Sequence, residues 1–197
     1  MKKDYQEVIN QYLDVQPVVI NSNLVSAQNR IRYYWSNWKI SQPKDKNIFF
    51  QDIINDDRKV NVARMQASKQ DFITKTSLID NFQFVTVSEN KKSNTLTLLP
   101  KDNLVVFDCN DKHYLGITPK NIERYENSSE NIKLCLDNYN KLKTNSEKCR
   151  FLLPEEAEQL QTVPIGYTDE VSKSERLKML GNGWTVDVIT HIFKEMN

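Results

Sequence analysis

The sequence predicts a mixed α/β protein in which two ordered ends enclose a small, irregular module built from short strands. Three observations support this fold class. Residues 4–38 fit one helix followed by two strands, residues 42–149 hold short strand patterns between long polar loops, and residues 150–197 fit two helices. The chain is long enough for one full domain or two small ones.

The composition is that of an ordinary globular protein of 197 residues, with 39% hydrophobic and 27% charged residues. A net charge of +1 gives no global attraction to nucleic acid, so such binding must come from local patches. No apolar run approaches the roughly 20 residues that span a bilayer, and residues 1–13 lack the apolar core of a signal peptide. Three cysteines without CxxC spacing favour reduced thiols. We therefore expect a cytoplasmic protein.

The first ordered segment contains three predicted elements. Apolar residues recur at helical spacing in residues 4–13, and Pro17 follows. Residues 17–21 (PVVIN) fit a buried strand, and residues 31–38 (IRYYWSNW) fit a second one. The short link between the two strands favours an antiparallel pair.

Polar and apolar side chains alternate around the start of the second strand. Side chains two residues apart point to the same face of a strand, so Gln28, Arg30 and Arg32 form a polar row. One amide and two guanidinium groups in a row are suited to hold the polar edge of a ligand. Two arginines in surface salt bridges would explain the same pattern. The opposite face would carry Ile31, Tyr33 and Trp35.

The middle region predicts little regular structure. Strand patterns occur at residues 82–87 (FQFVTV), 94–99 (NTLTLL) and 104–108 (LVVFD), and residues 131–142 fit a helix. Stretches rich in Lys, Asn, Asp and Ser separate these patterns and are typical of loops. We therefore expect a small module of short strands with long polar loops.

The last region predicts two helices. The first starts near Pro154, which fits the first helical position, and is ended by Pro164. The second lies within residues 182–196, with Asn182 or Thr185 as its cap. Its buried stripe would consist of Trp184, Val188, Ile189, Ile192 and Phe193.

Two of the four glycines, Gly181 and Gly183, flank Asn182 just before this last helix. Glycines on both sides of one residue favour a turn that lets the backbone approach another group closely. A simple turn at the entry to the helix would have the same spacing.

Three stretches together resemble conserved motifs of one enzyme family. VSAQNRIRYYW (residues 25–35), RFLLPEEAEQLQTVPIGYTD (150–169) and RLKMLGNGWTVDVITHIF (176–193) are similar, in this order, to the eighth, ninth and tenth motifs of carbon-5 cytosine DNA methyltransferases. The long interval after the first stretch is where that family carries its target-recognition domain. The spellings YYW, YTD and GNGW look closest to a branch that includes phage enzymes and the animal de novo methyltransferases.

The resemblance implies an α/β fold that is only part of the family's. It would be the C-terminal portion of a Rossmann-like, S-adenosylmethionine-dependent methyltransferase sheet with a small irregular α+β target-recognition domain. Residues 1–41 would end the catalytic domain, residues 42–149 would form the recognition domain, and residues 150–197 would return to the catalytic domain.

The resemblance also implies roles for the polar row. Arg32 would hydrogen-bond the O2 atom of a cytosine flipped out of the duplex. Arg30 would order the catalytic loop and a nearby phosphate, and Gln28 would support the row. A flipped base must be held by its polar edge, and fixed positive charge near O2 stabilises electrons that enter the ring.

For the cofactor, S-adenosylmethionine, the resemblance implies one wall of the pocket in the GNGW stretch. Asn182 and Gly183 would contact the methionine end of the cofactor, and Trp184 would pack nearby. The ninth motif would seat the recognition domain on the catalytic domain. The family usually has Thr or Ser where Leu153 stands, so a capping hydroxyl is missing there.

Other parts of the family's chemistry are absent from this sequence. None of its six prolines precedes a cysteine, no Glu-Asn-Val occurs, and no Gly-rich cofactor motif precedes the eighth motif. The attacking thiol and the assisting acid are therefore missing, and we expect no methyl transfer by this chain alone. The chain would be one subunit of a split enzyme, whose partner chain carries the first six motifs, or a truncated piece. Either would leave an apolar face of the sheet exposed.

A non-catalytic DNA-binding or regulatory subunit of similar shape is the alternative. A basic stretch in the middle region offers contacts for double-stranded DNA, since Lys anchors phosphates while Asn and Thr read base edges. A solvated turn would have the same composition. The candidate DNA-binding residues are Lys91, Lys92, Ser93, Asn94, Thr95 and Lys101. His113 and His191 lack the spacing of metal ligands, so no metal site is expected. The resemblance is compatible with roles in restriction-modification, in evasion of restriction by a phage, or in regulation.

Overall fold

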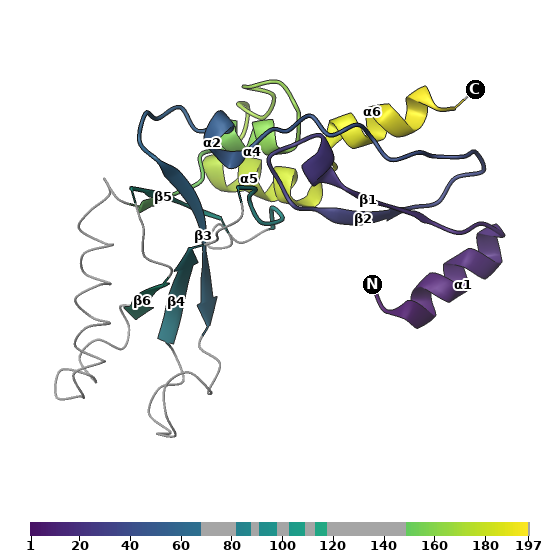
Figure 1. Ribbon diagram of the computed structural model, residues 1–197, viewed down its shortest axis with the longest axis horizontal. Helices are drawn as coiled ribbons and strands as arrows, with labels where there is room; N and C mark the ends of the chain where they lie inside the picture. Colours follow the sequence, from purple (N-terminus) through teal and green to yellow (C-terminus); the bar gives the residue numbers. More distant parts are fainter. Residues whose placement is uncertain (68–81, 88–90, 98–102, 109–112, 118–148, 197) are drawn as a thin grey trace, which may run out of the picture.

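The computed structural model describes residues 1–67, 82–87, 91–97, 103–108, 113–117 and 149–196. Figure 1 shows them as two small sheets with helices between and beside them. The helices are α1 (Lys3–Leu13), α2 (Phe50–Ile53), α4 (Pro154–Leu160), α5 (Lys173–Asn182) and α6 (Val186–Lys194), and a 3₁₀ turn spans Ser22–Leu24. The strands are β1 (Val18–Asn21), β2 (Ile31–Tyr34), β3 (Val60–Ala67), β4 (Phe82–Val87), β5 (Leu104–Phe107), β6 (His113–Ile117) and β7 (Cys149–Phe151).

Both sheets are antiparallel. β1 pairs with β2, with Ile20 opposite Arg32, which confirms the strand pair predicted at the start of the chain. The larger sheet has the strand order β6-β4-β3-β5-β7. Its strands β4 and β5 are two of the three predicted in the middle region. In the part of the chain that the structure describes, no helix is long and apolar enough to cross a membrane.

The third strand predicted in the middle region, at residues 94–99, is wrong for its described part. Residues 94–97 form no strand because side chains take up the backbone of Leu96 in place of a neighbouring strand. Just before it, Ser93 forms an isolated parallel bridge with Gln28. The helix predicted at 131–142 lies outside the described residues.

The main hydrophobic core joins the start, the middle and the end of the chain. Ala27 precedes β2, Leu96 belongs to the middle region and Leu160 ends α4, and all three are at most 6% exposed. The predicted boundaries near residues 41 and 150 therefore do not separate independent cores, and they stay predictions. The core cluster contains Ala27, Phe50, Ile53, Ile54, Val60, Val62, Leu96, Val105, Phe107, Leu152, Ala157, Leu160 and Leu180.

A second core lies between β1 and α6. Ile20 and Val188 are fully buried and Ile192 is 7% exposed, which confirms part of the predicted stripe on the last helix. Trp184 and Phe193, predicted in the same stripe, are instead 66% and 58% exposed. Trp184 precedes α6 and does not share its apolar face. Phe193 stacks on the indole ring of Trp38 at the edge of this core, with ring centroids 6.4 Å apart.

The turn predicted around Asn182 is helical. Gly181 and Asn182 complete α5, and the chain leaves the helix at Gly183, whose φ of −71° is open to any residue. The Gly183 N–H donates to the Met179 carbonyl at 2.9 Å. An added Cβ at Gly183 would lie 3.3 Å from that carbonyl oxygen, so a side chain would crowd the helix end. Thr185 holds the position before α6, without a side-chain capping bond.

Helix α4 begins at Pro154, as predicted. Leu153 offers no capping hydroxyl, but the Glu156 carboxylate accepts a hydrogen bond from the Leu153 N–H at 2.8 Å. The same carboxylate pairs with Arg150 at 2.6 Å. A carboxylate in the first turn accepts a hydrogen bond from a free N–H and interacts favourably with the positive end of the helix dipole. The missing hydroxyl therefore leaves the helix intact.

A buried ion pair fixes α4 to α5. The Glu158 carboxylate is fully buried and accepts hydrogen bonds from the Gly166 and Thr168 N–H groups at 2.7 and 2.8 Å. Arg176 of α5 donates to the same carboxylate at 3.0 Å. Burial alone would raise the pKa of Glu158, but the hydrogen bonds from Thr168, Gly166 and Arg176 outweigh it and lower that pKa.

Stability should fall on acidification through Glu158. Because its pKa is lower in the folded state, its contribution is complete above the unfolded pKa of about 4.3 and is lost as the pH falls through the folded value. We expect the free energy of unfolding in urea to decrease from about pH 5 to pH 3, and to decrease less in Glu158→Gln. Glu155→Gln removes a more exposed partner of Arg176 and should follow the parent. Equal pH slopes for parent and Glu158→Gln would contradict this account.

Candidate functional site

Gln28 and Arg30 lie in the segment that leads into β2 and are 0% and 3% exposed. Local hydrogen bonds set the path of this segment. The Asn21 side-chain oxygen accepts from the Arg30 N–H at 2.9 Å, and the Arg30 carbonyl accepts from the Ser22 N–H at 3.0 Å. The loop between β1 and β2 is closed in this way, and both side chains reach the interior.

The Arg30 guanidinium connects three backbone carbonyls. Nη1 donates to the Leu96 carbonyl at 2.9 Å, and Nη2 donates to those of Gly181 and Gly183 at 3.1 and 2.7 Å. Nε is buried and has no hydrogen-bond partner among the described groups. Burial, and after it repulsion from Arg32, lowers the pKa of Arg30 to about 10, so the group stays charged at neutral pH. The expected contact of Arg30 with a phosphate or a catalytic loop stays a prediction.

Gln28 binds the other backbone polar group of Leu96, its N–H. Its side-chain oxygen accepts from the Leu96 N–H at 2.8 Å. Its Nε2 donates to the Leu160 carbonyl at 3.0 Å and reaches the Gln161 side-chain oxygen at 3.3 Å. Two neighbouring members of the polar row therefore bind both polar groups of Leu96 and connect the middle region to the end of α4.

Gln161 is a residue of this site that sequence reasoning missed. It is 1% exposed, and its side-chain oxygen accepts from the Thr185 hydroxyl at 3.0 Å. Its Nε2 donates to the Leu180 carbonyl, and its own carbonyl accepts from the Val186 N–H at 2.9 Å. An amide on the same helix face as Ala157 and Leu160 was the available signal, because a polar group on an apolar face needs partners.

Arg32 carries the more accessible guanidinium of the polar row. It lies in β2, is half-buried, and Nη1 donates to the Ile31 carbonyl at 2.8 Å. Burial raises the pKa of Tyr34, and the charges of Arg32 and Arg30 oppose that shift. Besides burial, repulsion from Arg32 lowers the pKa of Arg30, and the Arg32 side chain itself is only half-buried.

The predicted cofactor residues follow directly on the carbonyls that Arg30 binds. Asn182 is exposed at the end of α5, and Trp184 is exposed just after Gly183. Arg30 donates to the Gly183 carbonyl, between these two side chains. The structure therefore brings the polar row and the stretch from Asn182 to Trp184 together.

The predicted DNA-binding residues lie mostly in structural contacts. Lys92 donates to the backbone carbonyls of three residues, Asn23, Ser26 and Ile48, and burial lowers its pKa. Ser93 is fully buried in the bridge to Gln28.

Among the remaining candidates, Thr95 donates to the Asn29 carbonyl at 2.6 Å. Lys91 is exposed beside the Phe49 ring, with Nζ 5.3 Å from its centroid. Asn94 is half-buried, and Lys101 lies outside the described residues. A DNA contact at any of the six candidates stays a prediction.

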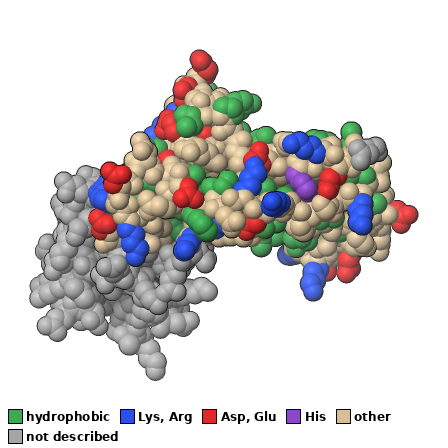
Figure 2. All heavy atoms as spheres, turned by 45° about the horizontal axis from the view of Figure 1, so that its top comes forward, with side chains coloured by type: hydrophobic (Ala, Val, Ile, Leu, Met, Phe, Trp, Pro, Cys, Tyr) green, Lys and Arg blue, Asp and Glu red, His purple; other side chains and the backbone are tan. Residues whose placement is uncertain are grey.

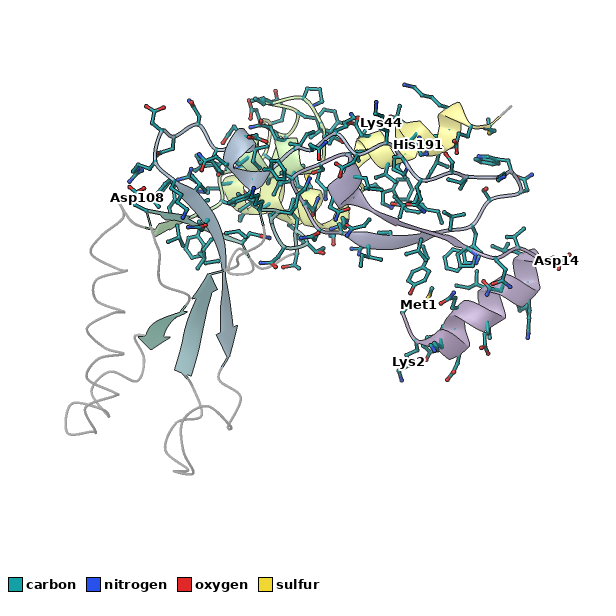
Figure 3. All side chains as sticks on the ribbon, in the orientation of Figure 1. Met1, Lys2, Asp14, Lys44, Asp108 and His191 are labelled. Atoms are coloured by element: carbon teal, nitrogen blue, oxygen red, sulfur yellow. The ribbon has the colours of Figure 1, made fainter. Side chains whose placement is uncertain are left out.

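A cavity of about 530 Å³ lies elsewhere, between the loop that contains Lys44 and helix α6. Figure 3 labels Lys44 and His191 at its rim. Lys46 pairs with Asp187 at 2.6 Å across it. Figure 2 shows basic side chains around the histidine on this face, with acidic ones among them, so the surroundings carry both signs of charge. No group of three or more His, Cys, Asp or Glu side chains in the described ranges is placed to hold a metal ion.

Arg30 and Arg32 should differ sharply in their effect on stability. Arg30→Met leaves three carbonyls without their donor in the interior, and each lost partner is costly there, so we expect a loss on the order of 3 kcal/mol. Arg32→Met is the matched control and should change stability by less than about 0.5 kcal/mol, because the Arg32 side chain is more accessible. Urea unfolding of both variants measures the difference. Similar losses for the two variants would contradict the contacts described for Arg30.

The arrangement joins a strand with a polar row to a helix end that carries an exposed amide and an exposed indole. A comparison with protein-family models supports the resemblance of the three motifs. The model for C-5 cytosine-specific DNA methylase matches residues 8–197. That family methylates cytosine in DNA and uses S-adenosylmethionine. Because the match covers nearly the whole sequence, the chain belongs to the C-5 cytosine-specific DNA methylase family.

Proposed function

We propose that this chain carries the target-recognition region and half of the active site of a DNA (cytosine-5-)-methyltransferase. One observation carries the proposal. Arg30 directly precedes β2, the proposed base-binding strand, and its Nη2 lies 3.1 and 2.7 Å from the carbonyls of Gly181 and Gly183, where the proposed cofactor wall begins. Two proposed ligand-binding segments, far apart in the sequence, therefore meet at one buried side chain.

In this proposal Arg32 holds a flipped cytosine. Its guanidinium is permanently charged, partly accessible and anchored on a strand, so it can donate to O2 of the base without large reorganisation. Charge fixed near O2 stabilises the electrons that enter the ring when a nucleophile attacks C6. Arg30 fixes the strand beneath Arg32, and Gln28 fixes the neighbouring segment.

The side chains around Gly183 fit one wall of a site for S-adenosylmethionine. Asn182 offers an exposed amide and Trp184 an exposed ring, the two kinds of group that would bind the polar and apolar parts of such a molecule. The Gly183 N–H is already bonded to the end of α5, so the glycine would contribute close approach rather than a donor. When bound, the cofactor supplies the methyl group. Arg30 and Gln161 keep this wall in place.

The attacking thiol and the assisting acid would come from outside these 197 residues, because the sequence has no Pro-Cys or Glu-Asn-Val. Another chain or further residues of the same polypeptide could carry them. We call this chain together with that part the complete enzyme. The motifs YYW, YTD and GNGW support membership of the branch that includes phage enzymes and the animal de novo methyltransferases.

Exposed apolar side chains mark where such a part would pack. On the face of the β1–β2 pair opposite Arg32, Val19 is 45% exposed, Ile31 56% and Tyr33 36%. Helix α1 buries none of its side chains, and Figure 3 shows it below this pair. Its apolar residues Tyr5, Val8, Tyr12 and Leu13 are between 49% and 87% exposed. Apolar faces of this kind are typical of surfaces that another element covers.

Methyl transfer should require both parts. We expect no transfer to cytosine C5 from labelled S-adenosylmethionine with this chain alone and clear transfer once the part carrying Pro-Cys and Glu-Asn-Val is added, since only the complete enzyme has a nucleophile. Scintillation counting of a duplex DNA library measures the transfer. Transfer by this chain alone would refute the incomplete site. Sequence-dependent DNA binding without transfer by the mixture would support the alternative, a regulatory subunit.

Arg32→Ala should remove turnover while DNA binding persists. Loss of one donor to a developing charge typically costs about 10²–10³ in rate, so we expect a decrease of this size in kcat of the complete enzyme. Arg32→Lys keeps the charge without the planar fork and should lie between parent and Arg32→Ala. Single-turnover assays and filter binding separate the two effects. Unchanged turnover in Arg32→Ala would remove Arg32 from the site.

A further inference from the structure

Four buried polar side chains form a connected group, which we call the polar bridge: Gln28, Arg30, Gln161 and Thr185. Gln161 bonds directly to Gln28 and Thr185, and Arg30 is connected to Gln28 through the backbone of Leu96. All four are at most 3% exposed. They come from three separate stretches, which are the segment before β2, the end of α4, and the residue before α6. The cluster therefore lies where the three recognised motifs meet.

One end of the polar bridge binds the middle region. Gln28 accepts from the Leu96 N–H at 2.8 Å and Arg30 donates to the Leu96 carbonyl at 2.9 Å. Both backbone polar groups of Leu96 are therefore held by side chains of the polar bridge. A shift of the segment around Leu96 must then move the segment that leads into β2, or break two buried hydrogen bonds.

The other end binds the stretch from Leu180 to Val186. Arg30 donates to the Gly183 carbonyl. The side-chain oxygen of Gln161 accepts a hydrogen bond from the Thr185 hydroxyl at 3.0 Å, and the backbone carbonyl of Gln161 accepts one from the Val186 N–H at 2.9 Å. These contacts enclose Trp184 on both sides, although its own ring is exposed. The backbone on both sides of Trp184 is therefore held by hydrogen bonds to Arg30 and Gln161.

Gln161 connects the two ends a second time. Its side-chain oxygen lies 3.3 Å from the Gln28 Nε2 and accepts from Thr185, so one atom serves both ends. Bonds of this kind are little screened in the interior, and a missing partner leaves a costly unsatisfied group. An apolar side chain at position 161 could fill the same space, as Leu160 does next to it. The amide of Gln161 is therefore explained by its hydrogen bonds rather than by packing.

We propose that Gln161 is a positioning residue, which fixes the stretch Asn182–Trp184 relative to the base-binding strand and to the segment around Leu96. The proposal rests on the proposed function for the identity of the ligands, and deepens it. It takes Gln161 to act through Thr185 and Gln28, with no contact of its own to substrate or cofactor. Loss of the Gln161 side chain should therefore weaken cofactor binding more than it slows the chemical step.

The first experiment uses the chain by itself and is independent of any activity. Hydrogen exchange is followed by NMR at the Leu96 and Val186 amides, which lie at the two ends of the polar bridge. Gln161→Met should accelerate exchange at both amides by at least about fivefold, since local opening no longer breaks the shared bonds. Gln159→Met is the matched control in α4, because the Gln159 side chain makes a single long bond of 3.4 Å, to the Ile53 carbonyl, within the described part of the chain. It should leave both amides unchanged. Faster exchange at neither amide, or at Val186 alone, would overturn the proposal.

Thr185 provides a second variant pair that keeps the test informative if Gln161→Met folds poorly. Its side chain makes no capping bond to α6, so Thr185→Val removes only the link to Gln161. Thr185→Val should reproduce the faster exchange at Val186, and Thr185→Ser should restore the parent rate. Equal rates in the Val and Ser variants would count against the proposal.

The complete enzyme gives the last readout. Gln161→Met should raise KM for S-adenosylmethionine about tenfold, because the stretch Asn182–Trp184 would no longer be held in place for the cofactor. A tenfold change corresponds to about 1.4 kcal/mol of binding free energy. The same variant should change kcat less than threefold. A fall in kcat with an unchanged KM would overturn the positioning role. If the complete enzyme transfers no methyl group at all, the proposed function fails, while the exchange data still decide whether Gln161 couples the two segments.

Discussion

A buried guanidinium is the constraint on which the arrangement of this chain depends. Arg30 is 3% exposed and lies against three backbone carbonyls, with no carboxylate among the partners described for it. A buried charge is costly unless hydrogen bonds offset its desolvation, and here three carbonyls bind the two terminal nitrogens while Nε has no partner among the described groups. The segment around Leu96 and the end of α5 must therefore stay where their carbonyls meet Arg30. The site follows from this requirement, because Arg32 lies two residues from Arg30 and Trp184 directly follows Gly183.

The two arginines of the row divide two tasks. Arg30 is buried just before β2 and connects the start of this strand to the segment around Leu96 and to the end of α5. Arg32 lies within β2, and its side chain is half-buried and partly accessible. In α4 a single side chain has two roles, since Glu156 binds Arg150 and also caps the helix.

Some of the regular elements were predictable from the sequence because their local patterns agree with the fold, whereas α2, α5, β3, β6 and β7 were not predicted. The strand pair β1–β2, strands β4 and β5, and the start of α4 at Pro154 follow from apolar runs and proline positions. Residues 94–97 were mispredicted as a strand because Leu96 bonds side chains distant in the sequence, which no local pattern reveals. The exposure of Trp184 was missed for a similar reason, since α6 begins only at Val186, whose N–H donates to the Gln161 carbonyl of a segment distant in the sequence. The meeting of the polar row with Gly181 and Gly183 could be expected only from the order of the three motifs.

A crystal structure of the complete enzyme with cytosine-containing duplex DNA and S-adenosylhomocysteine tests the central claim most directly. The account predicts a flipped cytosine whose O2 accepts a hydrogen bond from Arg32, with Asn182 and Trp184 against the cofactor and Arg30 still on the carbonyls of Gly181 and Gly183. A structure in which Arg32 faces solvent or a distant phosphate, or in which Asn182 and Trp184 lie away from the cofactor, would contradict it.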